Sequence, residues 1–168
     1  MADGPAEDAP PASSGSGHRL DNVDSLRGPT ASQAAGLTLA AARAIIAAVR
    51  AEARSLAVAM SCAVVDSGDQ LVAFERMDGA DLVGIALAQD KAFTALVNRM
   101  PTADLPPIVQ PGTEFFGYHT VAGGRTIIFA GGMPLERAGV LVGAVVVSGG
   151  DSTQDQRALE AGVRAFGG

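Results

Sequence analysis

Residues 139–147 constrain the fold of this chain more than any other segment, because they form a nearly unbroken apolar run. Their sequence, Gly-Val-Leu-Val-Gly-Ala-Val-Val-Val, is rich in β-branched residues and contains no charged side chain. A strand with one face in water alternates apolar and polar residues, whereas a strand covered on both faces does not. The run therefore predicts a central β-strand with other layers of structure packed on both sides.

Further strands are predicted on both sides of a Pro-rich connecting segment, residues 101–112. Residues 61–65 and 71–75 are short β-like runs, and the Asp-Ser-Gly-Asp sequence between them supplies turn chemistry, so together they predict a hairpin. Residues 125–130 predict another strand, which the Gly-Gly-Met-Pro sequence of residues 131–134 separates from the central one.

Helical periodicity marks three other segments. Residues 38–56 begin with Thr38, a suitable N-cap, and their apolar residues recur at helical spacing. A second helix begins near Asp81, whose carboxylate suits the positive end of a helix dipole, and ends where Pro101 stops it. Residues 151–153 offer a cap for a last amphipathic helix. Hairpins alternating with helices in this order predict an α+β fold with an antiparallel sheet.

The predicted helix that ends before Pro101 has two apolar faces. The stripe that we expect to face the core contains Leu82, Ile85, Gln89, Phe93, Leu96 and Met100. The opposite face carries Gly84, Leu87, Ala88, Lys91 and Ala95, which is less polar than a solvent-facing surface. Because a monomer would leave that face exposed, we expect a symmetric homo-oligomer.

Composition and charge bound the domain organisation and the partners. Residues 1–36 contain four of the nine prolines, seven charges and no aromatic residue, so they predict a disordered N-terminal arm before one domain at residues 37–168. The net charge of −6 has the wrong sign for binding nucleic acid or an anionic membrane. The N-terminus has no secretory signal pattern and no apolar run reaches membrane-spanning length, so we expect a soluble, cytoplasmic protein.

Five stretches in order resemble the GlcG/HbpS family, which is related to the C-terminal domain of PduO-type proteins and often labelled haem-degrading. They are Val-Val-Asp-Ser-Gly at 64–68, the run from Leu71 to Ala80, Lys-Ala-Phe-Thr-Ala at 91–95, Gly-Gly-Met-Pro-Leu at 131–135 and Val-Ser-Gly-Gly at 147–150. The resemblance spans roughly residues 37–167 and implies a profilin-like α/β/α sandwich whose central antiparallel sheet is flanked by helices. It also implies assembly into oligomers. Val146 replaces a usual family glycine, which would narrow a pocket under the strand end.

The strongest candidate for chemistry is His119, the one histidine after residue 37. A neutral imidazole can bind haem iron or act as a general base, and Phe116 and Tyr118 beside it could flank a flat ligand. Glu114, five residues earlier, could form an acid/base pair with His119 if the segment folds back. A solvated loop carboxylate and a merely structural histidine are the alternatives.

Other polar residues are candidates for ligand binding. The ammonium of Lys91 needs an anionic partner, either a carboxylate or a haem propionate. Arg76 and Asp78 end the predicted hairpin, where one could bind an anion and the other shape the turn. Ser148 and Gly149 precede a helix start, so backbone N–H groups there could hold a carboxylate or phosphate oxygen, although a plain tight turn explains them equally well.

These residues leave the function open between three hypotheses. The first is a small-molecule binding protein, with haem as the cofactor that the resemblance implies, His119 as iron ligand and Lys91 or Arg76 near the propionates. The second is a cofactor-independent cyclase, isomerase or lyase of biosynthetic metabolism that uses Glu114 and His119 for proton transfer. The third is a sensing or accessory subunit. Fold kinship does not choose between them.

Overall fold

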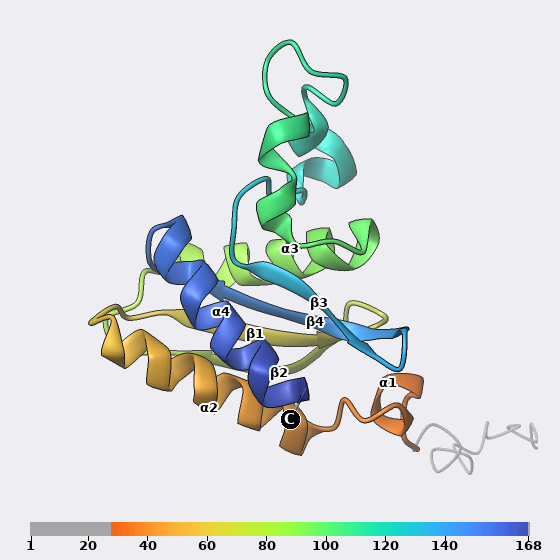
Figure 1. Cartoon of the computed structure of the whole chain (residues 1–168), viewed down its shortest axis with the longest axis vertical. Coiled ribbons are helices and arrows are strands. Elements are labelled where there is room, and N and C mark those ends of the chain that lie inside the picture. The colour runs from red at the N-terminus through yellow and green to blue at the C-terminus, as the bar shows by residue number, and fades with distance from the viewer. Residues whose placement is uncertain (1–27, 168) are drawn as a thin grey trace, which may run out of the picture.

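The computed structural model describes residues 28–167, in which one four-stranded antiparallel sheet has the strand order β2-β1-β4-β3 (Figure 1). Within this range no helix has the length and apolar character to cross a membrane. In chain order the elements are α1 (Ala31–Ala34), α2 (Leu39–Ser55), β1 (Ser61–Asp66), β2 (Leu71–Arg76), α3 (Val83–Asn98), the 3-10 helices η2 (Thr102–Asp104), η3 (Pro106–Ile108) and η4 (Tyr118–Gly124), then β3 (Gly132–Arg137), β4 (Val140–Ser148) and α4 (Ser152–Gly167).

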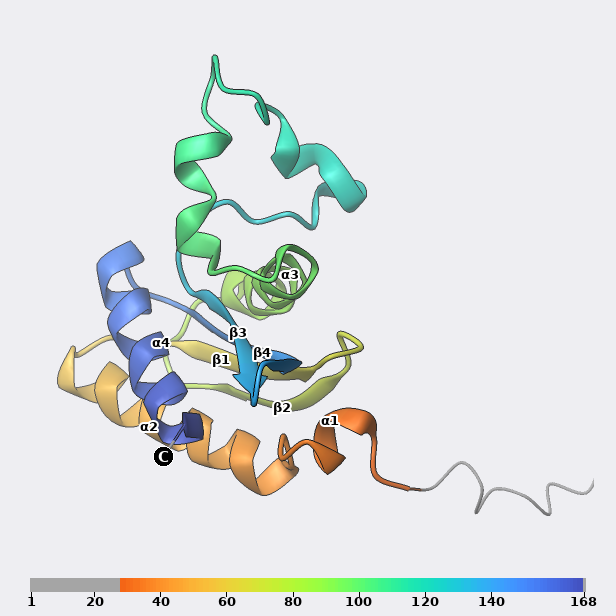
Figure 2. The ribbon, with the colours of Figure 1, turned by 45° about the vertical axis from the view of Figure 1, so that its right-hand side comes forward.

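Helices cover both faces of the sheet, which confirms the α+β sandwich. Helices α2 and α4 lie side by side on one face and α3 lies on the other (Figures 1 and 2). The central strand β4 is buried from Val142 to Ser148, as the apolar run predicts, because it pairs with β1 and β3 and is covered above and below. Val146 is fully buried among small residues on the α3 side.

Helix α2 forms as its sequence predicts. The Oγ1 of Thr38 accepts a hydrogen bond from the Ala41 N–H at 3.2 Å, so it caps the helix. Its apolar stripe, which includes Ile45 and Val49, is buried in the larger core cluster between α2, α4 and the sheet. Cys62 lies in the same cluster, and burial raises the pKa of its thiol, so it acts as a small apolar residue.

The predicted strand at residues 125–130 is wrong, and the edge strand β3 lies seven residues further along. Residues 125–130 instead pack against α3, where the Ile127 N–H donates to Thr94 Oγ1 at 2.9 Å. Pairing with β4 starts only near Gly131, whose carbonyl accepts from the Val147 N–H at 2.7 Å. Pro134 is tolerated inside β3 because an edge strand needs hydrogen bonds on one side only.

The predicted core face of α3 is also wrong, because the helix turns its small residues to the sheet. Gly84, Ala88 and Ala95 are buried, whereas Leu82 is 73% exposed, and of the predicted stripe only Leu96 is buried. Val97, outside that stripe, is 55% exposed. Small side chains let the backbone of α3 approach the sheet closely, whereas the larger side chains of the predicted stripe would hold the helix further away. The expected homo-oligomer therefore loses its original argument and stays a prediction, and Leu82, Val83 and Val97 are the large apolar residues that α3 exposes.

Most of the predicted N-terminal arm, residues 1–27, lies outside the described residues. The described part contains α1, which begins with a capping box: the Oγ1 of Thr30 accepts from the Gln33 N–H, and the Thr30 N–H donates to Gln33 Oε1. Ser32 is buried, and its Oγ lies 2.8 Å from Ser67 Oγ in the β1–β2 turn. The chain immediately before residue 37 thus packs on the domain.

Candidate functional site

Residues 101–124, here called the projecting segment, stand away from the sandwich beyond α3 (Figures 1 and 2). Helix η4 places His119 on this segment, after Gly117 turns the chain with φ +91°. His119 and Glu114 are both exposed, and no hydrogen bond or ion pair joins them among the described residues. In residues 28–167, no group of three or more His, Cys, Asp or Glu side chains could hold a metal ion.

The aromatic residues beside His119 divide into an anchor and an exposed surface. Tyr118 donates its phenol O–H to Asn98 Oδ1 of α3 at 2.7 Å, so it ties the segment to the domain. Phe116 is 62% exposed and Phe115 is 48% exposed, the latter with its ring edge toward Tyr118 at 6.5 Å between centroids. Phe115 and Tyr118 border a small, mostly apolar cavity of about 130 Å³, lined by Asn98, Met100, Leu105, Ile108, Val109, Phe115 and Tyr118.

Lys91 finds its anionic partner inside the same chain. Its side chain is fully buried, and its Nζ donates to Asp155 Oδ2 and to the Val147 carbonyl oxygen, both at 3.0 Å. The ring of Phe129 lies 5.0 Å from Nζ. This ammonium is therefore inaccessible to a ligand in this structure, and the pair joins α3 to α4 across the end of β4.

The turn at Ser148 and Gly149 also holds a carboxylate, but that carboxylate belongs to Asp155. The Gly150 N–H donates to Asp155 Oδ1 at 2.8 Å, and the Gly149 N–H also donates to this side chain. Burial raises the pKa of Asp155 and lowers the pKa of Lys91, and each partner offsets part of the other's shift. Sequence reasoning missed Asp155; an acidic residue in the first helical turn after Gly-Gly is the signal that could have found it.

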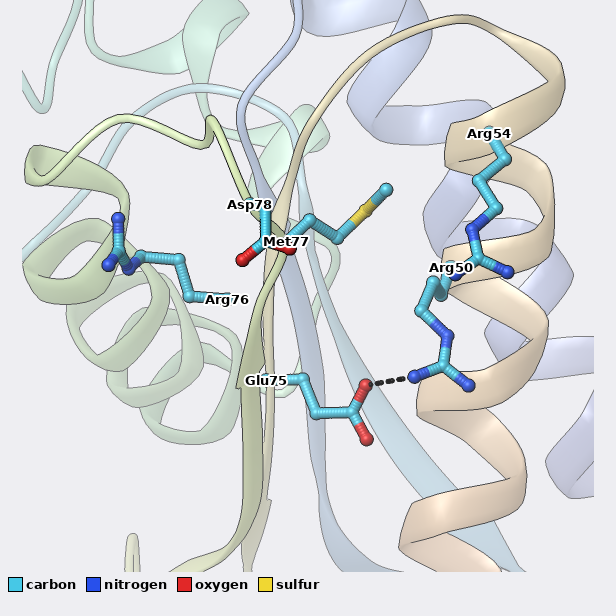
Figure 3. Close-up of a pocket in the computed structure, with 6 residues that line it drawn as sticks. All are labelled: Arg50, Arg54, Glu75, Arg76, Met77 and Asp78. Atoms are coloured by element: carbon cyan, nitrogen blue, oxygen red, sulfur yellow. Dashed lines mark hydrogen bonds and ion pairs between the residues drawn. The ribbon is translucent and has the colours of Figure 1, made fainter.

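A second hollow lies between α2 and the end of β2 (Figure 3). This arginine pocket has a volume of about 360 Å³ and is lined by Arg50, Arg54, Glu75, Arg76, Met77 and Asp78. Asp78 therefore lines a cavity, and its role in ligand binding stays a prediction. The guanidinium of Arg76 points to the other side of β2 and donates to the Ala80 carbonyl oxygen at 3.1 Å (Figure 3). The two arginines on α2 were not predicted, because helical spacing marked them only as the polar face.

This architecture is an α+β sandwich that carries a histidine-bearing segment on one side and a charged pocket on the other. The chain belongs to the HbpS-like family: the model of the family described as haem degrading protein HbpS-like matches residues 37–164. The resemblance to the GlcG/HbpS family is thereby confirmed.

Individual relatives agree with this assignment. An uncharacterized 15.0 kDa protein from Citrobacter freundii is 37% identical over 134 residues, which cover 80% of this chain and 94% of that protein. The crystal structure of Klebsiella pneumoniae protein ORFY is 35% identical with a TM-score of 0.76, over 78% of this chain and 90% of that one. The structure of a PduOC:heme complex is 31% identical with a TM-score of 0.74, over 77% of this chain and 94% of that one.

Proposed function

We propose that this protein binds haem on the projecting segment, with His119 as the residue that holds the iron. The observation that carries the proposal is an exposed imidazole, unbonded to other described residues, three residues after the exposed Phe116 on the same segment. Imidazole is a common axial ligand of haem iron, and apolar side chains shield the faces of a flat macrocycle. Bound haem would supply redox or oxygen chemistry at its iron. The related structure of a PduOC:heme complex supports this ligand class.

The size and charge of the segment define how such a ligand would fit. The cavity of about 130 Å³ beside Tyr118 is well below the roughly 300–1,000 Å³ of usual small-molecule pockets, so the ring would lie on the surface, against Phe115 and Phe116. Residues 100–124 contain no Lys or Arg. Propionates would therefore reach solvent or the flanking Arg99 and Arg125, rather than the buried Lys91 that the sequence suggested.

Arg125 is already held in place at the base of the segment. Its guanidinium pairs with Asp69 at 3.0 Å and with Asp90 at 3.1 Å, and it stacks on Phe93 at 4.1 Å from the ring centroid. Two carboxylates already neutralise this cation, so Arg99 is the better partner for a propionate.

Proton transfer by Glu114 and His119 is the second proposal. Both side chains are exposed on the same segment, so each is open to a substrate. Loss of a general acid or base lowers turnover by about 10²-fold or more, which Glu114→Gln and His119→Ala would then each show.

Hemin titration tests the first proposal, with absorbance of the Soret band as the readout. The wild type should give a saturable, shifted band, and His119→Ala should lose the shift and bind about tenfold more weakly or worse, because iron ligation is removed. His18→Ala is the matched control, since it removes the other imidazole of the chain and should change nothing. An unshifted wild-type band, or a His119→Ala band like that of the wild type, would refute haem ligation by His119.

A further inference from the structure

The apolar residue that lines the arginine pocket is Met77. Met77 packs against the larger core cluster, its N–H donates to the Met60 carbonyl at 3.0 Å, and its Sδ accepts from the Met60 N–H at 3.5 Å. The Ala80 N–H donates to the Met77 carbonyl at 3.0 Å and closes a turn in which Gly79 has φ +85°. Asp78 lies in this turn, so the Ala80–Met77 hydrogen bond holds its backbone next to Met77.

Opposite charges line this pocket, and only two of its five charged side chains pair with each other. The NH1 of Arg50 donates to Glu75 Oε2 at 2.8 Å, and both side chains are just over 40% exposed (Figure 3). Arg54, one turn further along α2, makes no side-chain hydrogen bond or ion pair with the described residues, and neither does Asp78. One cationic and one anionic group thus line the same cavity without pairing with each other.

We propose that the arginine pocket binds a small zwitterion that carries a carboxylate and an ammonium, of the amino-acid class. The carboxylate pairs with Arg54 and with the N–H groups of Arg50 that Glu75 leaves free, in the two-pronged manner that guanidinium favours. The ammonium pairs with Asp78, and the carbon chain between the two groups lies on Met77. The volume of about 360 Å³ falls within the usual range for small-molecule pockets.

Charge complementarity favours a zwitterion over an ion of one sign. A simple anion at Arg54 would share the pocket with the carboxylates of Glu75 and Asp78, and a simple cation at Asp78 would share it with two guanidiniums. Like charges in the same cavity repel each other, whereas a zwitterion meets an opposite charge at each end. This site is independent of the projecting segment, so hemin binding and zwitterion binding can succeed or fail separately.

Calorimetric titration of the full chain tests the proposal with probes of graded charge separation. Glycine, β-alanine and γ-aminobutyrate are the zwitterions, and butyrate and propylamine carry one charge each. Because the pocket offers only a few exposed contacts, the best zwitterion should have a dissociation constant on the order of 1 mM, and it should bind about tenfold more tightly than either single-charge probe. Hemin is absent from these titrations.

Three exposed variants assign the contacts. Arg54→Gln should weaken the best zwitterion about tenfold and remove its advantage over propylamine, while Asp78→Asn should remove its advantage over butyrate. Arg43→Gln, on the same helix but outside the pocket, should bind like the wild type. Circular dichroism checks that each variant is folded. The proposal is overturned if no zwitterion saturates by about 10 mM, if butyrate or propylamine binds equally well, or if both pocket variants leave binding unchanged.

Discussion

Replacing Lys91 by methionine tests how much the buried ion pair contributes to the fold. Methionine keeps a similar unbranched stem but removes the ammonium, so the carboxylate of Asp155 stays buried with only the Gly149 and Gly150 N–H groups as partners. The Val147 carbonyl also loses its donor. An uncompensated charge in an apolar interior is costly, since neither water nor a counter-ion can reach it.

The expected loss is about 3–5 kcal/mol, the scale for removing one partner of a buried pair. Domains of this size have total stabilities of about 5–15 kcal/mol, so the variant should unfold much more readily. At about 4 °C per kcal/mol, the melting temperature should fall by roughly 12–20 °C. Asp155→Asn should lose a similar amount, because it leaves the ammonium without its charged partner.

A double-mutant cycle separates the interaction energy between Lys91 and Asp155 from the stability that each single substitution costs. Lys91→Met combined with Asp155→Asn should be more stable than the sum of the single losses predicts by about 2–3 kcal/mol, because no lone charge remains. Urea denaturation supplies the free energies. The exposed pair Arg50 and Glu75 is the control, and its cycle should give a coupling of about 0–1 kcal/mol. Additivity of the Lys91 and Asp155 variants within about 0.5 kcal/mol would refute the reasoning.

Three further predictions follow from packing and charge. Gly131→Ala should destabilise by about 3 kcal/mol or more in thermal unfolding, because φ is +118° and the new Cβ would clash with the Val147 carbonyl oxygen of β4. Gly139→Ala, with φ +75° and open space around it, should cost only about 1 kcal/mol. Burial raises the pKa of Asp155 above 3.8, so between 3.8 and the folded-state pKa the folded chain keeps a proton that the unfolded chain has released, and the contribution of Asp155 to stability should fall as the pH rises through that window. Urea midpoints of the wild type across the window should show this fall, and an equal slope in Asp155→Asn would contradict it. Light scattering should give a mass above that of one chain, and Leu82→Glu with Val97→Glu should lower it; a monomeric wild type would disprove the oligomer.

The candidate site was predictable in its residue types but not in its surroundings. A histidine with aromatic neighbours marks residues 114–119 in the sequence, and the structure adds that Phe116 is exposed while Tyr118 is bonded to α3. The need of Lys91 for an anion follows from its apolar neighbours. The arginine pocket escaped prediction because it joins one face of α2 to residues that follow β2, and no local pattern records that contact.

The sequence alone determined the elements whose signal is local. The uninterrupted apolar run of β4 requires cover on both faces, and Thr38 with the stripe behind it defines α2. Only the tertiary structure decided which face of α3 is buried, because periodicity shows that two apolar faces exist but not which one meets the sheet. It also decided that Asp155, 64 residues away, neutralises Lys91. The physical reason is that burial depends on neighbours that only the fold brings together: the Lys91 side chain of α3 reaches Asp155 of α4 at the end of β4, from the opposite face of the sheet, and a linear pattern carries no information about that meeting.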